Sequence, residues 1–480
     1  MGTSLKSNSY LVLDQGGHSS RALVFDASGR LLTQAAVPVA TDKPKLDWVE
    51  QNPAELVESL RQAANLALQG LTQEQRNCLL AAALVTQRSS LVCWHKITGE
   101  ALYPVISWQD RRGAQWLSQQ NIDTNWIHQR TGLTLSAHYG ASKIRWCLDH
   151  LAQVKQAYDN GCLTCGPLAS WLIGQLTDSK AARVDPANAS RTLLWNMETL
   201  DWDEELLLCF GIEQSLLPKL TATQSDYGLL VLDEISLPLR LVNGDQSAAI
   251  FAMGDLSSDT AYVNLGTGAF ISVPWAQTKA CPKFLLKSLV HQSDTACFVV
   301  EGTVNGAASA LDWAQQYCGL ENLDRLDDWA KKEKTIPLFI NGIAGLGSPY
   351  WCEMSPEFVG DGSKEQKLVA VLESIVFLLQ INLGIMSKNG FDGSKIQVSG
   401  GLSQLDSLCQ KLADISGLIV FRPQQVEASA RGAAFWLAGR PSDWQVVASD
   451  RFLPSRKGSM TIKRRFLAWQ QVLQERLKRA

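Results

Sequence analysis

YLVLDQGGHSSRALVFD, residues 10–26, contains two short apolar runs on either side of a turn rich in glycine and serine. Tyr10–Asp14 and Arg21–Asp26 each have the length and the apolar content of a buried β-strand. The residues between them supply glycine and small polar side chains, which suit a tight turn. The stretch therefore predicts a β-hairpin with a glycine-rich tip.

A similar stretch recurs later in the chain. Thr260–Asn264 is an apolar run that leads into Leu265–Gly268, and the strand-like run Ala269–Val273 follows. One supersecondary unit near the head of each half indicates a duplicated domain, with a boundary between residues 246 and 258.

The length of the chain agrees with two domains, because 480 residues are too many for one ordinary core. We expect one domain over residues 1–250 and a second over residues 251–480. A helix is predicted to begin at Pro53, and buried strands are predicted at Leu79–Val85 and Leu239–Asn243. Strands that alternate with helices predict α/β layers.

Composition argues against several classes of partner. The chain has 44 basic and 47 acidic residues, a formal charge of −3, so we expect no nucleic acid and no anionic membrane as partner. The most apolar segment, Ser374–Met386, is interrupted by Gln380 and Asn382 and is expected to be a buried helix. Met1–Tyr10 lacks the apolar core of a secretion signal.

Cysteine usage indicates the compartment. Eleven cysteines, an odd number, are scattered through the chain, which favours free thiols and a cytoplasmic location. Cys162 and Cys165 have the spacing of a metal pair, but the sequence nearby offers no second pair to complete a structural zinc site.

The two glycine turns are candidate phosphate loops, because consecutive backbone N–H groups at such a tip can bind phosphate oxygens. Gly16 and Gly17 can serve this role in the first half, and Gly266 and Gly268 in the second. Asp14, at the end of its strand, can hold Mg²⁺. Taken singly, either turn can also be an ordinary turn. Further polar groups come from Ser19, Ser20, Arg21 and Thr267.

Together these stretches resemble the FGGY family of carbohydrate kinases, and within it the glycerol kinases most closely. The Walker A pattern and the protein-kinase signatures are absent from the sequence. The matching segments, in chain order, are Leu13–Gly16, Ser19–Arg21, Gln87–Arg88, Ile106–Arg112, Asn188–Thr192, Asp201–Trp202, Gly244–Gln246, Gly266–Gly268, Phe270, Glu301–Gly302, Gly345–Gly347, Pro349–Trp351 and Ser399–Gly401.

The resemblance implies a fold of two actin-like (ribonuclease H-like) domains with an inter-domain cleft that closes over ATP, Mg²⁺ and a small polyol or sugar. It implies that Asp245 is the general base, that Asp14 and Asp245 associate with the metal, and that Gly400 and Gly401 lie beside the adenosine. It implies that Gly266, Thr267 and Gly268 form the second phosphate loop. The residues of the implied acceptor pocket are Gln87, Arg88, Ser89, Trp108, His138, Asp245, Gln246 and Phe270.

Five positions depart from the glycerol-kinase pattern. Ser89 replaces a glutamate that binds glycerol hydroxyls, and His138 replaces a tyrosine. Gly17 and His18 replace two threonines of the first loop, and Leu405 replaces an asparagine on the adenine side. The loss of buried hydrogen-bonding groups changes which acceptor is selected, and the smaller Ser89 leaves room for a larger one.

Three hypotheses stay open. The first is an ATP-dependent phosphotransferase acting on a polyol or sugar, with a small-molecule partner and a dimeric or tetrameric assembly. The second is a degenerate nucleotide-binding or regulatory protein with little turnover, suggested by the departures at Gly17, His18, Ser89 and Leu405. The third is an actin-like ATPase that signals to a partner protein, which would not require Gln87, Arg88 or Trp108.

Overall fold

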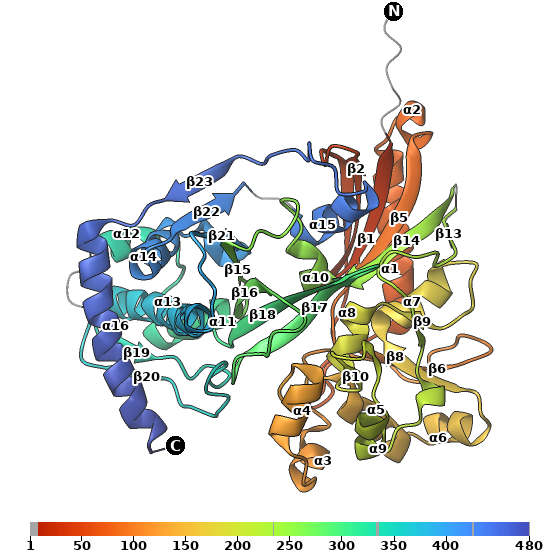
Figure 1. The fold of residues 1–480 in the computed structure, drawn as a ribbon, viewed down its shortest axis with the longest axis horizontal. Helices are drawn as coiled ribbons and strands as arrows, with labels where there is room; N and C mark the ends of the chain where they lie inside the picture. The colour runs from red at the N-terminus through yellow and green to blue at the C-terminus, as the bar shows by residue number, and fades with distance from the viewer. Residues whose placement is uncertain (1–7, 234, 333–335, 425–426, 480) are drawn as a thin grey trace, which may run out of the picture. The chain divides into compact units, whose positions relative to one another are not determined.

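The computed structural model describes residues 8–233, 235–332, 336–424 and 427–479, and the chain divides into two compact units (Figure 1). Each unit has its own hydrophobic core. The first unit comprises Met1–Asp255, Ser288–Phe298 and Val426–Val446, and the second comprises Leu256–Lys287, Val299–Gln425 and Val447–Ala480.

A six-stranded mixed sheet forms the centre of the first unit. The predicted hairpin is confirmed, with β1 antiparallel to β2 and parallel to β5, which in turn is parallel to β14. In sheet order the strands are β13 (Leu229–Val231), β14 (Ser236–Gly244), β5 (Leu79–Thr86), β1 (Ser9–Gln15), β2 (Ser19–Asp26) and β3 (Leu31–Pro38).

Helix α1 (Pro53–Gln69) covers part of this sheet. It begins where the sequence predicts, because the Asn52 side chain accepts hydrogen bonds from the N–H groups of Ala54 and Glu55, and Pro53 has no N–H that would need an acceptor. Its apolar residues recur at helical spacing, so Leu56, Leu60 and their neighbours are buried against the strands.

A smaller four-stranded sheet and several helices complete the first unit. In sheet order the strands are β4 (Glu50–Gln51), β7 (Val105–Ile106), β6 (Leu91–His95) and β8 (Leu163–Pro167). Two short strand pairs are β10 (Trp195–Asn196) with β11 (Asp201–Trp202) and β9 (Arg183–Val184) with β12 (Lys219–Leu220). The helices are α2 (Gln73–Arg76), α3 (Ala114–Gln119), α4 (Thr124–Thr131), α5 (Gly140–His150), α6 (Ala152–Asp159), α7 (Leu168–Leu176), α8 (Pro186–Ala189), α9 (Glu204–Phe210) and α10 (Asp245–Ala249), with short 3₁₀ turns at Ser190–Thr192 and Gln214–Leu216.

The second glycine hairpin belongs to a seven-stranded sheet, and its prediction is also confirmed. Strand β15 pairs antiparallel with β16 and parallel with β21. In sheet order the strands are β17 (Leu286–Gln292), β18 (Ala296–Val304), β16 (Ala269–Trp275), β15 (Thr260–Leu265), β21 (Lys395–Ser399), β22 (Ile419–Pro423) and β23 (Ser449–Phe452).

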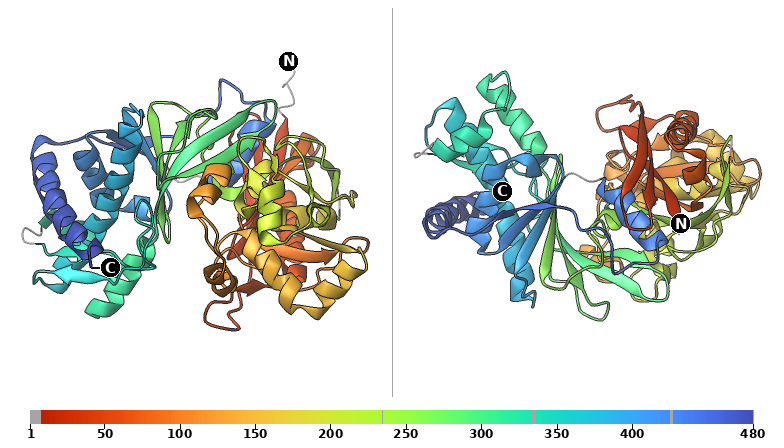
Figure 2. Two further views of the ribbon diagram at one scale, coloured as in Figure 1. Left: turned by 60° about the horizontal axis from the view of Figure 1, so that its bottom comes forward. Right: turned by 90° about the horizontal axis from the view of Figure 1, so that it is seen from above.

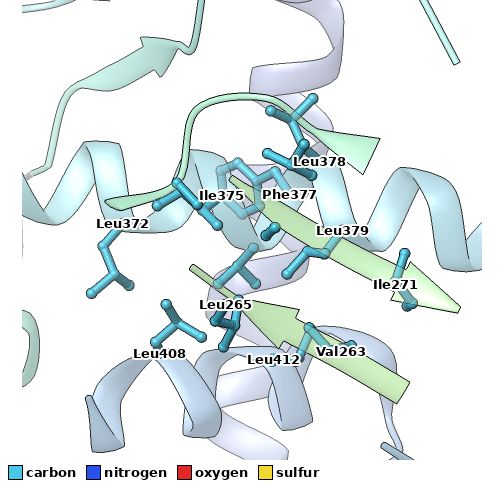
Figure 3. Close-up of a cluster of buried hydrophobic side chains, with 14 of the residues drawn as sticks. Val263, Leu265, Ile271, Leu372, Ile375, Phe377, Leu378, Leu379, Leu408 and Leu412 are labelled. Carbon is cyan, nitrogen blue, oxygen red and sulfur yellow. The ribbon is translucent and has the colours of Figure 1, made fainter. Parts of the chain in front are cut away.

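Helix α13 (Lys364–Lys388) forms the centre of the second unit's core. Figure 3 shows Leu372, Ile375 and Leu379 of this helix packed toward side chains of β15, β16 and α14 (Asp406–Ser416). Among the described residues it is the one helix long and apolar enough to cross a membrane, but 78% of its most apolar window is buried inside the structure. The predicted buried helix over Ser374–Met386 is thus confirmed.

The remaining elements of the second unit surround this core. They are α11 (Ala308–Cys318), α12 (Leu326–Lys332), the strand pair β19 (Leu338–Ile340) and β20 (Glu357–Val359), a 3₁₀ turn at Gly401–Gln404, and the terminal helix α16 (Arg456–Leu477), whose Trp469 donates to the carbonyl of Phe339 at 2.8 Å.

One late helix, α15 (Ala428–Leu437), is part of the first unit. Figures 1 and 2 show this blue helix beside the red strands β1 and β2. Arg431 is buried there, and its guanidinium donates to the carbonyls of Gly29, Ala252 and Gln445. Gly432 lies so close to α10 that a Cβ at this position would be 1.9 Å from the carbonyl oxygen of Ala248.

Candidate active site

Three neighbouring strands of the first unit end at the same edge of the sheet. Gln15 of β1 lies opposite Thr86 of β5, and Thr86 lies opposite Gly244 of β14. Because all three strands are parallel, the residues that follow them emerge side by side. The first glycine turn, the segment from Gln87 and the residue Asp245 are therefore brought together, although the sequence separates them widely.

Asp14 lies at the end of β1 and is 7% exposed. Burial, together with the negative charge of Asp245, raises the pKa of Asp14 to about 7, while Arg21 opposes the shift. Arg21 itself forms an ion pair with Glu427, just before α15. Two carboxyl groups that influence each other's ionisation are thus present at the strand ends.

Asp245 is the first residue of α10, directly after β14. Its Oδ1 accepts from the N–H of Gln246 at 2.7 Å and lies 4.0 Å from Nε of Arg88. Burial raises the pKa of Asp245, and the nearby guanidinium opposes the shift. Arg88 also donates to the side chains of Gln246 and Ser247. Gly244 makes room for it, since a Cβ there would be 2.6 Å from the arginine stem.

Gln87 and Ser89 are buried on either side of Arg88. The Gln87 amide donates to the side chains of Gln15 and Gln51, at 3.0 and 2.7 Å. Ser89 has a φ of 64°, a left-handed conformation that non-glycine residues rarely adopt. The Gln87 Oε1 and Ser89 Oγ atoms have no hydrogen-bond partner among the described residues. The two side chains therefore lie beneath the surface of the candidate pocket.

Trp108 and His138 contact each other, with ring centroids 5.7 Å apart in an edge-on arrangement. The backbone N–H of Trp108 donates to Oγ of Ser90. The NH1 atom of Arg111 lies 3.5 Å from Nδ1 of His138. Burial and the surrounding cations hold the pKa of His138 well below its ordinary value, so the imidazole is neutral. The predicted aromatic part of the pocket is thus adjacent to a neutral histidine.

The first glycine turn is held by its own hydrogen bonds. The Gly16 N–H donates to the carbonyl of Ser19 at 3.0 Å, and the Gly17 carbonyl accepts from Gln51 at 2.9 Å. Ser19 Oγ accepts from Arg21, whereas the Ser20 hydroxyl is fully buried and bonded to Ser59 of α1. In this structure Ser20 anchors the strand to the helix.

In the second unit the Gly266–Gly268 tip and Gly400 follow the neighbouring parallel strands β15 and β21, where Asn264 lies opposite Ser399. The Gly266 N–H donates to the carbonyl of Gly268 at 2.9 Å. The Thr267 carbonyl accepts from the N–H groups of Ala307 and Ser309 at the start of α11. The loop is therefore packed against a helix N-terminus.

Gly400 and Gly268 have steric reasons to be glycine. Gly400 has a φ of 89°, and a Cβ there would be 2.5 Å from the Leu265 carbonyl oxygen. A Cβ at Gly268 would be 2.9 Å from the Val304 carbonyl oxygen. Gly401 begins the 3₁₀ turn that leads to Leu405, which packs against the core. Phe270 is half-buried in β16, so it belongs to the second unit.

The carboxylates fit a divalent cation by their chemistry. Asp14 and Asp245 are oxygen donors whose mutual repulsion a cation would relieve, and Mg²⁺ in phosphoryl-transfer sites takes one or two carboxylates together with substrate phosphates. Over the described ranges, no group of three or more His, Cys, Asp or Glu side chains is arranged to hold a metal. A cation here would therefore depend on the nucleotide for further ligands.

Some residues of the site were not predicted to be part of it. Arg111 lies within the family-like segment Ile106–Arg112, but its contact with His138 joins residues 27 positions apart. Ser90 follows Ser89 and orients the Trp108 backbone. Glu427 pairs with Arg21 from 406 positions away, and the sequence carries no local signal for this contact.

The chain is similar to known proteins over most of its length. Residues 9–237 match the N-terminal domain and residues 261–438 the C-terminal domain of the FGGY family of carbohydrate kinases. Glycerol kinase of Halothermothrix orenii is 32% identical over 457 residues, 90% of each chain. Glycerol kinase of Synechocystis sp. is 30% identical over 477 residues, 95% of this chain and 96% of the relative.

Solved structures support the same fold. A crystal structure of Plasmodium falciparum glycerol kinase with ADP superimposes with a TM-score of 0.86 and 23% identity, covering 98% of both chains. The two-domain fold with mixed α/β sheets is therefore confirmed. With both family domains matched in order along most of its length, the chain belongs to the FGGY family of carbohydrate kinases.

Proposed function

We propose that this chain transfers the γ-phosphoryl group of ATP to a hydroxyl of a small polyol or sugar. The observation that carries the proposal is the convergence of Asp14, Arg88 and Asp245 at the ends of β1, β5 and β14. Such a transfer needs alignment and charge neutralisation more than covalent chemistry. A carboxylate paired with an arginine, beside an aromatic wall, supplies the groups that an acceptor alcohol needs.

Asp245 acts as the base. Its carboxylate accepts the proton of the acceptor hydroxyl as the oxygen–phosphorus bond forms and the bond to the β-phosphate oxygen breaks, which releases ADP. Burial raises the pKa of Asp245 and so makes it more basic, while the positive charge of Arg88 opposes the shift. Arg88 and Gln246 bind acceptor hydroxyls, Trp108 packs against the carbon skeleton, and neutral His138 exchanges hydrogen bonds with a hydroxyl.

Backbone groups of the first glycine turn and of Gly266–Gly268 bind phosphate oxygens, and Gly400 and Gly401 bound the adenosine site. Asp14 and Asp245 hold Mg²⁺, directly or through water. When bound, the cation neutralises the charge of the β- and γ-phosphates. The role of Phe270 in the acceptor pocket stays a prediction. The same holds for a cytoplasmic location and for a dimeric or tetrameric assembly.

A coupled ADP-release assay over glycerol, tetritols, pentitols, pentuloses and hexuloses tests the function. We expect acceptor-dependent turnover with at least one of them. We also expect Asp245→Asn to lower kcat by about 10²–10⁴-fold with little change in ATP affinity, because the amide cannot take the proton. Turnover of the variant at the wild-type rate would remove Asp245 as the base.

A second function is favoured by a specific observation. Ser89 stands where glycerol kinases have a glutamate, and its hydroxyl is buried and unpaired among the described residues. A nucleotide-binding protein with little turnover would show ATP binding by calorimetry but no stimulation by any acceptor of the panel. That combination would replace the kinase proposal.

A further inference from the structure

Lys143 is a fully buried cation beneath the candidate acceptor pocket. It lies in the first turn of α5 and has 0% exposed surface. Its Nζ donates to three backbone carbonyls: Ser89 at 3.0 Å, Ser107 at 2.8 Å and His138 at 2.8 Å. An ammonium has three N–H donors, so these carbonyls satisfy it completely.

The three carbonyls belong to three separate segments of the pocket. Ser89 follows Arg88 after β5, Ser107 precedes Trp108 after β7, and His138 precedes α5. One side chain thus joins the backbones that carry the arginine, the tryptophan and the histidine of the acceptor site. A further hydrogen bond, from the backbone N–H of Trp108 to Oγ of Ser90, links two of these segments directly.

A buried lysine is costly, which makes its use here informative. Burial strongly disfavours the charged form and lowers the pKa of Lys143 well below its ordinary value. An apolar side chain of similar size would avoid this cost but would leave three buried carbonyls without a donor. A neutral amide, with two N–H donors, could satisfy at most two of them. Only a multivalent donor can fix all three segments to one point.

We propose that Lys143 is a positioning residue for the acceptor, which sets the spacing of Arg88, Trp108 and His138 by holding the backbones of their three segments together. The left-handed φ of Ser89 fits this role, because such a conformation persists where surrounding contacts over-determine it. This inference rests on the proposed kinase function and adds to it a determinant of acceptor binding that does not touch the acceptor.

The test is a steady-state analysis of Lys143→Met and of the milder Lys143→Gln, with the acceptor and ATP varied separately. Lys287→Met is the matched control. Lys287 is likewise buried, and its Nζ donates to the carbonyls of Gln277 and Lys279, but it lies in the second unit, outside the segments that Lys143 joins. Thermal unfolding of all three variants reports the stability change separately.

We expect Lys143→Met to raise the acceptor KM or lower acceptor kcat/KM by about 10- to 100-fold while the KM for ATP stays unchanged, because small displacements of positioning groups weaken the reactive geometry. Lys143→Gln should recover part of the loss. Lys287→Met should lower the melting temperature with no selective effect on the acceptor.

Several results would overturn the role. One is a folded Lys143 variant with the wild-type acceptor KM and kcat/KM. Another is an equal loss for acceptor and ATP, and a third is the same kinetic change in Lys287→Met. Failure of both Lys143 variants to fold, with Lys287→Met folded, would make Lys143 a folding determinant instead. Absence of acceptor turnover in the wild-type protein would contradict the proposed function itself, a result distinct from these.

Discussion

His291 lies against the face of Trp436, with the ring centroids 3.5 Å apart and the planes nearly parallel. Its Nε2 is 2.9 Å from Oγ of Ser293, and its Nδ1 has no partner among the described residues. Burial lowers the pKa of this imidazole from 6.5 to about 3. The folded protein therefore holds His291 neutral under conditions in which the unfolded chain would protonate it.

The sign of the resulting pH dependence follows from proton binding. Between pH 6.5 and about 3 the unfolded chain binds a proton at His291 and the folded chain does not, so acidification favours unfolding. We expect the free energy of unfolding to fall by up to about 1.4 kcal/mol per pH unit from this group. His291→Phe should flatten that slope in urea titrations at pH 7.5, 6.0 and 5.0.

The control for this measurement is Phe210→Leu, at a buried residue of the same unit, which should lower the free energy of unfolding but keep the wild-type slope because no titratable group is removed. Identical pH dependence in wild type and His291→Phe would show that the buried imidazole is protonated without cost.

Among single residues, the groups with a local sequence signature could be predicted. Asp14 and Asp245 end apolar strands beside glycines, and the structure brings them to one sheet edge. The burial of Lys143 could not be predicted, because a lysine in an amphipathic helix is normally solvated. Only the fold brings three carbonyls to its Nζ. The left-handed φ of Ser89 could not be predicted either, since serine rarely adopts that conformation.

Helices α10 and α15 approach each other closely at Gly432. A methyl group on Gly432 would meet a backbone carbonyl oxygen of α10, which cannot rotate away as a side chain can. We expect Gly432→Ala to destabilise the protein by about 3 kcal/mol, as overpacking does. Because α10 begins with Asp245, kcat should fall as well. Urea unfolding and the ADP-release assay measure the two effects.

Gly174 of α7 provides the matched control in the same unit, since no atom outside its chain neighbours and the adjacent turns of its own helix backbone lies within 4 Å of a Cβ built there. Gly174→Ala should stabilise the protein by about 0.5–1 kcal/mol, because alanine loses less backbone freedom in a helix. Equal effects of the two substitutions would contradict the close contact between α10 and α15.

At the scale of elements, strands bounded by glycine were the most predictable. Both hairpins and β21 appear where apolar runs meet turn residues, because burial and turn chemistry act locally. The membership of α15 in the first unit could not be predicted. Its contacts are with strands and helices more than 170 positions earlier, for which the sequence holds no periodic signal.

At the scale of the whole molecule, the two units have separate cores. Leu372, Ile375 and Leu379 of α13 are in the core of the second unit, whereas Leu56 and Leu60 of α1 are in a core of the first. Separate cores predict that thermal unfolding is not two-state. Calorimetry should show more than one transition, with a calorimetric enthalpy larger than the van't Hoff enthalpy. One transition with equal enthalpies would contradict this.

Ligands should shift these transitions selectively. An acceptor at about 100 times its Kd should stabilise the first unit by about 2.7 kcal/mol, since the proposed pocket residues other than Phe270 belong to it. The continuous ranges 1–250 and 251–480 stay a prediction of the domain organisation, and the compact units add the segments Ser288–Phe298 and Val426–Val446 to the first.

The place of α15 in the first unit has a consequence for biosynthesis. A ribosome releases the central sheet long before it translates Arg431, the residue whose guanidinium binds the Gly29 and Ala252 carbonyls. At typical elongation rates, roughly 10 to 30 seconds separate the synthesis of the last strand of this sheet from the synthesis of α15. During that interval the nascent chain exposes the surface that α15 will cover, so we expect chaperones to engage it there.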